Sequence, residues 1–197
     1  MSKSKEIKFL DPNLKNKSKT VEDKIQLYKF NEDMLPLPTE IEISESGTCN
    51  RSCSFCPRSA PNFADKKEFI SNSLHEKLCL ELKELNYKGT IRYSGFVEPM
   101  LDKNIFNLIS MVRKYLPGSN IEMVTNGDPL NLKRLKKLFE HGLNKILISS
   151  YDGKEETQKL EDLCIRANLN ETQYMVRHRY YSEEQDFGIT LSNRAGL

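Results

Sequence analysis

Short apolar runs alternate with longer amphipathic segments from residue 41 onward, and this alternation restricts the folds that the chain can adopt. Five of these runs have the length of strands, and they lie at 41–46, 90–94, 121–125, 145–149 and 172–177. Strands that alternate with helices at this pace predict parallel βα units joined by right-handed crossovers. The sequence therefore predicts an α/β fold built on a parallel sheet.

Four segments carry apolar residues at helical spacing. The first helix is predicted to begin at Ser73, because Ser73 and Glu76 have the spacing of a capping box. The second is predicted to stop at Pro117 and the third at Gly142. The four apolar stripes consist of Leu74, Leu78, Leu82 and Leu85; of Ile105, Leu108, Ile109, Val112 and Leu116; of Leu132, Leu135, Leu138 and Phe139; and of Leu160, Leu163, Cys164 and Ala167.

The number of units decides how far the sheet can close. An eight-unit barrel takes about 250 residues, or roughly 31 for each βα unit. The chain from residue 41 onward therefore supplies about five units, which is too few to close a standard barrel. We predict a partial (β/α) barrel in a core at 37–197 that is truncated at its C-terminal end. Residues 1–36 are predicted to form a basic, loosely ordered extension with a short helix around 21–29.

The overall composition excludes several classes of protein. The chain has 30 Lys and Arg against 28 Asp and Glu, so its net charge of +2 gives no strong signal for nucleic acid or a membrane. No run approaches the roughly 18 apolar residues of a spanning helix, and the start does not resemble a secretory signal. Five cysteines are an odd number for a disulfide scaffold, so we expect a reducing, cytoplasmic setting. Cys79 and Cys164 lie on helical stripes and are expected to be structural.

The other three cysteines share one short segment, GTCNRSCSFCPRS. Cys49, Cys53 and Cys56 are spaced C-x3-C-x2-C, directly after the first predicted strand. A 4Fe–4S cluster normally takes four cysteine ligands, so three thiolates would leave one iron open to another ligand. A structural zinc site is the alternative, but zinc typically takes a second ligand pair, which this segment does not offer.

Other polar segments follow the remaining strands. They read SGFVEPM at 94–100, VTNGD at 124–128 and ISSYDG at 148–153. In parallel βα folds, ligands gather at the C-terminal ends of the strands, so these segments are expected to face one site. Glu98 has an alternative reading as a carboxylate at a helix entry, and Asn126 and Gly127 form a common turn pair.

The three-cysteine segment, with Phe55 immediately before the last cysteine, resembles the cluster loop of the radical S-adenosylmethionine (radical SAM) superfamily. The resemblance covers residues from about 37 to the end of the chain. SNRAG, near the C-terminal end, resembles the segment that joins the catalytic barrel to a cysteine-rich, SPASM-type extension in one branch of that family.

The resemblance implies a set of roles. Cys49, Cys53 and Cys56 would hold three irons of a 4Fe–4S cluster, while S-adenosylmethionine (SAM) binds the fourth. The carbonyls of Ser94, Gly95 and Phe96, with the Glu98 carboxylate, would accept hydrogen bonds from its methionine ammonium. This segment departs from the family's glycine–glycine–glutamate element, because Ser94 replaces the first glycine and Phe96 and Val97 precede Glu98.

The remaining predicted contacts come from the later strands. Thr125 and Asn126 would reach the ribose or shape the pocket, and Ser149 would contact the cofactor, although a buried serine is often bonded only to backbone. Arg177 or Arg179 would pair with the methionine carboxylate, because a planar guanidinium suits that task. The strand register leaves the choice between the two arginines open.

The resemblance implies an enzyme that cleaves SAM to a 5′-deoxyadenosyl radical, which takes hydrogen from a substrate. That substrate is unknown; related enzymes act on peptides, on proteins or on small molecules. The implied partners are SAM and an electron donor such as flavodoxin or ferredoxin. Two alternatives stay open: a structural zinc or Fe–S module, and an inactive, truncated relative that acts as a binding protein. No residue is assigned a proton-transfer role.

Overall fold

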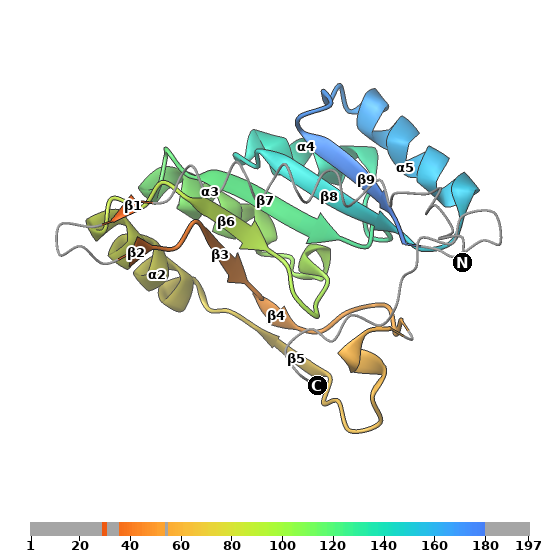
Figure 1. Cartoon of the computed structure of the whole chain (residues 1–197), viewed down its shortest axis with the longest axis horizontal. Coiled ribbons are helices and arrows are strands. Elements are labelled where there is room, and N and C mark those ends of the chain that lie inside the picture. Colours follow the sequence, from red (N-terminus) through yellow and green to blue (C-terminus); the bar gives the residue numbers. More distant parts are fainter. Residues whose placement is uncertain (1–28, 31–35, 54, 180–197) are drawn as a thin grey trace, which may run out of the picture.

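A five-stranded parallel sheet forms the centre of the molecule. The computed structural model describes residues 29–30, 36–53 and 55–179. The strands lie in the order β3 (Glu40–Ile43), β6 (Thr90–Tyr93), β7 (Asn120–Thr125), β8 (Lys145–Ser150) and β9 (Tyr174–His178), and every neighbouring pair is parallel. Figure 1 shows how these strands succeed one another across the sheet. The predicted α/β fold, a partial (β/α) barrel, is confirmed.

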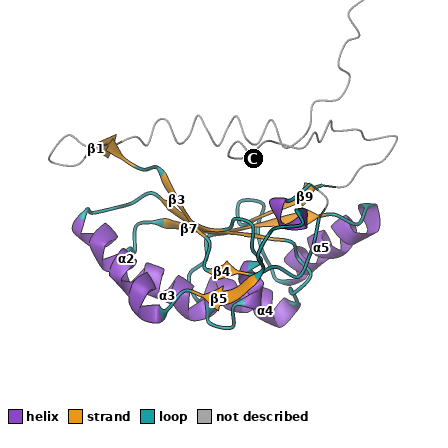
Figure 2. Ribbon diagram, turned by 90° about the horizontal axis from the view of Figure 1, so that it is seen from below, coloured by secondary structure: helices purple, strands orange, loops and turns teal. Residues whose placement is uncertain are grey.

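Helices cover one face of this sheet. They are α2 (Asn72–Glu84), α3 (Ile105–Tyr115), α4 (Leu132–Glu140) and α5 (Lys154–Arg166). All four lie on the same side of the strands (Figure 2). Among the described residues, no helix has the length and apolar character that a membrane span needs.

Alternate residues of the strands supply the core. In β7, Ile121, Met123 and Thr125 are buried, whereas the residues between them are only half-buried. Ile121 and Met123 belong to the core that packs on the helices, as the period of two in a strand and 3.6 in a helix requires. Cys79 and Cys164 are buried in this core, as expected, and burial raises their pKa values to about 11 and about 12.

The start of α2 differs from the prediction. The helix begins one residue before Ser73, and its N-cap is Ser71, whose side chain accepts a hydrogen bond from the Leu74 backbone N–H. Glu76 instead accepts a hydrogen bond from the Tyr115 hydroxyl, so the expected capping box does not form. The buried face of α2 carries His75, Cys79 and Leu82, whereas two leucines of the predicted stripe, Leu74 and Leu85, are exposed.

Two short antiparallel pairs flank the sheet. β1 (Lys29–Phe30) pairs with β2 (Pro36–Leu37), so Lys29 is not helical; the rest of the helix predicted at 21–29 lies outside the described residues. β4 (Ser46–Gly47) pairs with β5 (Lys66–Phe69). The run predicted as one strand at 41–46 is therefore divided between β3 and β4. β5 was not predicted, because its four residues are all exposed and show no apolar alternation.

This second pair determines where the cysteines lie. The segment at 48–65, which we call the cysteine loop, begins directly after β4 and ends directly before β5. It contains one short 3-10 helix, η1 (Pro57–Ser59). The SNRAG segment, by contrast, lies outside the described residues.

Candidate functional site

A pocket lies where the cysteine loop meets the C-terminal ends of β6, β7, β8 and β9. Its walls include the three predicted cluster ligands. They also include all but one of the predicted SAM contacts, namely Gly95, Phe96, Glu98, Thr125, Asn126, Ser149 and Arg177. The fold thus brings together residues that lie far apart in the sequence, at the edge where parallel sheets bind ligands.

Ser94 is the predicted contact that does not line the pocket. Its backbone N–H donates to the Ile43 carbonyl at 3.1 Å, and its own carbonyl accepts from Ser44 Oγ at 2.9 Å. The Ser94 carbonyl therefore already accepts one hydrogen bond from the segment that follows β3, and its contact with the methionine ammonium stays a prediction.

The residue after Ser94 has to be a glycine. Gly95 has a φ of +123°, a conformation that other residues rarely adopt. A Cβ at this position would lie 2.1 Å from Ser44 Oγ. A glycine is therefore required because the backbone at position 95 lies against the Ser44 side chain. Gly95 also forms part of the pocket wall.

The cysteine loop turns tightly around its thiols. The Cys56 N–H donates to the Cys53 carbonyl at 2.9 Å, and Cys56 is the N-cap of η1. All three loop cysteines are free and half-buried. The sulfur of Cys49 accepts from the Arg51 backbone N–H at 3.5 Å and from Asn126 Nδ2 at 3.8 Å. Hydrogen bonds of this kind to thiolate sulfur are among the factors that set the reduction potential of an iron–sulfur cluster.

The three loop thiols are candidate metal ligands at the pocket. Burial raises the pKa values of Cys49 and Cys53, so metal binding would displace their protons. Among the described residues, no three His, Cys, Asp or Glu side chains are grouped closely enough to share a single metal ion. The three thiols line one pocket, so each could bind a separate iron of a cluster there.

Glu98 is buried and joins two loops. Its Oε1 accepts from Thr125 Oγ1 at 2.7 Å and from the Met100 N–H at 3.0 Å, and its Oε2 accepts from the Asn126 N–H at 2.7 Å. Burial raises the pKa of this carboxyl, although the three hydrogen bonds oppose that rise. Glu98 is also the N-cap of η2 (Pro99–Leu101), so its alternative reading as a helix-entry carboxylate is confirmed.

Thr125 and Asn126 act partly as turn residues. The Thr125 hydroxyl accepts from the Gly127 N–H, and Asn126 Oδ1 accepts from the Asp128 N–H. The other end of the Asn126 amide reaches the cysteine loop, where Nδ2 donates to Asn50 Oδ1 at 2.7 Å. Asn126 therefore connects the end of β7 with the loop that carries the thiols.

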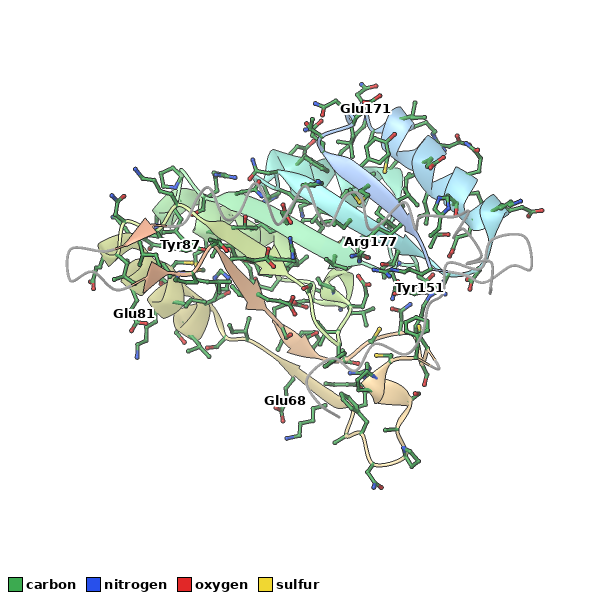
Figure 3. All side chains as sticks on the ribbon, viewed as in Figure 1. Glu68, Glu81, Tyr87, Tyr151, Glu171 and Arg177 are labelled. Carbon is green, nitrogen blue, oxygen red and sulfur yellow. The ribbon has the colours of Figure 1, made fainter. Side chains whose placement is uncertain are left out.

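Ser149 and the two arginines come from the last two strands. Ser149 pairs with Arg177 in the sheet, and Arg177 Nη2 donates to Ser149 Oγ at 2.9 Å. Both Arg177 and Arg179 line the pocket. Because they lie two residues apart, they project to the same side of the extended chain. Figure 3 shows Arg177 beside the C-terminal end of the sheet, close to Tyr151.

Two arginines of the cysteine loop were not predicted to contribute. Arg51 contacts carboxylates on the segments after β7 and β8. Arg58 donates to the carbonyls of Gly47 and Phe96, at 3.1 Å each, and forms an ion pair with Asp65. Only their positions beside the cysteines could have identified them from the sequence, because their partners are distant in the chain.

The fold and the pocket define a partial (β/α) barrel with a cysteine-lined cofactor pocket at its rim. The family profile described as Radical SAM superfamily matches residues 43–175. The chain therefore belongs to the radical SAM superfamily, whose members use a 4Fe–4S cluster and SAM.

Curated relatives agree with this assignment. The chain is 30% identical over 158 residues to the S-adenosyl-L-methionine-dependent 2-deoxy-scyllo-inosamine dehydrogenase of Niallia circulans, a match that covers 80% of this chain and 59% of that protein. It is 29% identical over 122 residues to a probable GTP 3′,8-cyclase of Thermococcus kodakarensis, covering 61% of this chain and 38% of the cyclase.

Solved structures show the same fold. BtrN in complex with AdoMet and 2-DOIA is 27% identical and matches with a TM-score of 0.64, over 73% of this chain and 57% of BtrN. Native anSMEcpe with bound AdoMet is 17% identical, with a TM-score of 0.56 over 71% of this chain and 43% of that one, and it supports the fold alone. The chain spans less than two thirds of the length of these relatives.

Proposed function

We propose that this chain is the core of a radical SAM enzyme and that its cysteine loop holds the catalytic cluster. The observation that carries the proposal is the convergence of three free, half-buried thiols with the polar ends of four strands in one pocket. A purely structural metal site would not need a pocket beside it. The division into an extension at 1–36 and a core at 37–197 stays a prediction, as do the cytoplasmic setting and the flavodoxin-like or ferredoxin-like donor.

The cysteines would hold the inorganic part of the cofactor. Cys49, Cys53 and Cys56 would each bind one iron of a 4Fe–4S cluster, which leaves one iron for SAM. When bound and reduced, the cluster and SAM supply a 5′-deoxyadenosyl radical that takes a hydrogen atom from the substrate. The chain's own contribution is to position the groups, to donate hydrogen bonds to the Cys49 sulfur and to shield the pocket.

Glu98 would receive the methionine ammonium. An ionised carboxylate has about four acceptor sites, and the contacts within the chain fill three of them. One site on Oε2 remains for a charge-assisted hydrogen bond. Burial raises the pKa of Glu98 and so favours the protonated carboxyl. A positive ammonium beside it would act in the opposite direction and favour the ionised form. The carbonyls of Gly95 and Phe96 lie in the same wall and would add neutral acceptors.

The arginines of β9 would receive the methionine carboxylate. Arg177 is the stronger candidate, because Ser149 accepts one of its N–H groups and thereby orients the guanidinium. Arg179 lies on the same wall, two residues further along. Replacing each arginine by Lys in turn and measuring SAM affinity by calorimetry would separate them, because Lys cannot make the bidentate contact.

The relatives act, by their names, on chemically unlike substrates. One is a dehydrogenase of 2-deoxy-scyllo-inosamine and another is a cyclase of GTP. What supports a common activity is the family profile, which matches residues 43–175 of this chain. We therefore assign SAM cleavage and hydrogen abstraction to this chain, and no particular substrate.

Anaerobic reconstitution tests the proposal. The protein is incubated with iron and sulfide, reduced with SAM present, and analysed for 5′-deoxyadenosine. We expect about four irons per chain in the wild type. The Cys53→Ala variant should lose the cluster and form no 5′-deoxyadenosine. Cys164→Ala is the matched control: it removes a thiol buried in the core, so it should retain both iron and product.

Three results would contradict the proposal. One zinc per chain and no iron after metal-replete expression would indicate a structural module. A cluster that binds SAM without cleaving it would indicate an inactive relative. Equal loss of iron in the Cys164→Ala control would show that the effect of Cys53→Ala is not specific to the loop.

A further inference from the structure

Arg51, between the first two cysteines of the loop, contacts three carboxylates at once. Its Nε lies 2.7 Å from Asp128 Oδ2, and its Nη2 also contacts Asp128. Nη1 and Nη2 lie 3.0 and 2.8 Å from the two oxygens of Asp152. Nη2 further lies 3.1 Å from Glu156 Oε1. Two of the three contacts are bidentate, which is the strongest geometry for an arginine–carboxylate pair.

The carboxylates belong to two separate strand-end segments. Asp128 follows β7, Asp152 follows β8, and Glu156 lies in the first turn of α5. Glu156 is held independently of Arg51, because its Oε2 accepts from the Ser150 hydroxyl and from the N–H groups of Tyr151 and Asp152. Glu156 is thus positioned by the barrel, and Arg51 attaches the cysteine loop to it and to the two aspartates.

Further contacts continue the attachment along the loop. Asn50 Nδ2 donates to Asp128 Oδ2 at 2.7 Å. The Arg51 guanidinium lies 5.3 Å from the centre of the Tyr151 ring, and that ring stacks on Phe55 with 5.6 Å between centroids. The loop is therefore fixed to the rim between Cys49 and Cys53, and again immediately before Cys56.

The charges make Arg51 hard to replace. Three carboxylates converge on one guanidinium, and the hydrogen bonds from Arg51 lower the pKa of Asp152. The Arg51 side chain is only 17% exposed, so water does not take its place readily. Without this cation, the carboxylates would repel one another and release the loop.

We propose that Arg51 is a positioning residue that locks the cysteine loop onto the ends of β7 and β8 before iron is bound. Ordering a free loop costs conformational entropy, and the clamp removes that cost from cluster assembly. The proposal rests on the proposed function, because it gives the loop a cluster to receive.

Thiol alkylation in the metal-free protein tests the clamp. Iodoacetamide is added to wild type, Arg51→Lys and Arg51→Ala, and the modification of each cysteine is followed by peptide mass spectrometry. We expect Cys49, Cys53 and Cys56 to react about tenfold faster in both variants, since a single charge-assisted hydrogen bond accounts for at least that factor. The buried Cys79 and Cys164 should stay protected, which shows that the barrel is folded.

The two variants separate geometry from charge. Arg51→Ala removes both the charge and the fork of the guanidinium. Arg51→Lys keeps the positive charge but lacks the forked guanidinium that makes the bidentate contacts. Faster alkylation in this variant therefore shows that those contacts, and not the charge alone, hold the loop. Arg92→Met is the matched control: it removes another arginine that bridges two carboxylates, but one outside the pocket, and it should leave the loop rates unchanged.

Unchanged or slower alkylation of the loop thiols in both Arg51 variants would overturn the proposal. So would equal acceleration in Arg92→Met, because the effect would then be general loosening. Iron uptake gives a second readout, and we expect slower and incomplete incorporation in Arg51→Ala. If the wild type takes up no iron, the proposed function fails, while the alkylation result still decides whether the clamp exists.

Discussion

The two faces of the central sheet are built from alternate residues of the same strands, yet they are held in different ways. The face that packs on α2 to α5 is apolar and almost fully buried (Figure 2). The opposite face is half-buried and charged. In β7, for example, Ile121 and Met123 face the helices, whereas Glu122, between them, faces away and is bound to Arg92 of β6.

The difference separates stability from function. The helix-covered face depends on a local period, which β6 and β7 repeat along their whole length. The opposite face depends on partners in other strands: Arg92 lies between Glu40 of β3 and Glu122 of β7, and Arg177 of β9 contacts Ser149 of β8. The pocket lies at the C-terminal end of this second face, so the residues proposed to bind the cofactor are arranged by long-range pairing.

The largest expected effect tests the apolar face. Ile121 is fully buried, and Ile121→Ala should lower the free energy of unfolding by about 4 kcal/mol, because it removes apolar contacts and leaves a cavity. Leu147 of β8 is half-buried and belongs to the opposite face, so Leu147→Ala should cost about 1 kcal/mol. Urea unfolding of both variants measures the difference. Equal losses would show that both faces contribute alike to stability.

The contrast also explains what could be predicted from the sequence. The five strands and four helices were predicted because each carries its own apolar period, as Ile105, Leu108 and Val112 do in α3. The predicted start of α2 was wrong, because Ser71 and Ser73 are both residues that can cap a helix, and Ser71 is the one that does so. The exposed strand β5 carries no apolar signal at all.

The candidate site was predictable in its parts but not in its connections. Cysteine spacing and strand-end placement brought the thiols and Glu98 to one pocket. The clamp was missed because Arg51 finds Asp128 and Asp152 at separations of 77 and 101 residues. No register could choose between Arg177 and Arg179, since both face the pocket.

The second prediction concerns an acid within the buried interior. Glu45 is only 1% exposed, and burial raises the pKa of its carboxyl to about 7, with smaller contributions from the negative charges of Asp102 and Glu98. An unfolded chain ionises this carboxyl near its ordinary value of about 4.3. Folding keeps the group protonated, so the stability that it contributes is present below that value and is lost as the pH rises through about 7.

Glu45→Gln should remove this loss. The quantity to compare is the free energy of unfolding of the variant minus that of the wild type. Between pH 4 and pH 8 this difference should rise by on the order of 3 kcal/mol in favour of the variant. Urea unfolding at both pH values gives the comparison. A gap between the two proteins that does not change with pH would show that Glu45 ionises normally and that this part of the interior is open to water.

The third prediction tests the charged face. Glu40, Arg92 and Glu122 form a row across β3, β6 and β7, and their side chains are between 13% and 18% exposed. Arg92→Met removes the central cation that the two half-buried carboxylates share. Since exposed pairs contribute up to about 1 kcal/mol and breaking buried ones costs 3–5 kcal/mol, we expect a loss of about 2 kcal/mol.

The origin of that loss can be separated by a second substitution and by salt. Adding Glu122→Gln to Arg92→Met removes one of the two carboxylate charges that faced Arg92. The double variant should therefore recover about half of the lost stability. In 1 M NaCl the cost of Arg92→Met should fall, because salt screens the repulsion between the carboxylates of Glu40 and Glu122. If neither change reduces the loss, Arg92 stabilises this face through the packing of its aliphatic stem, and the two faces of the sheet are held by the same force after all.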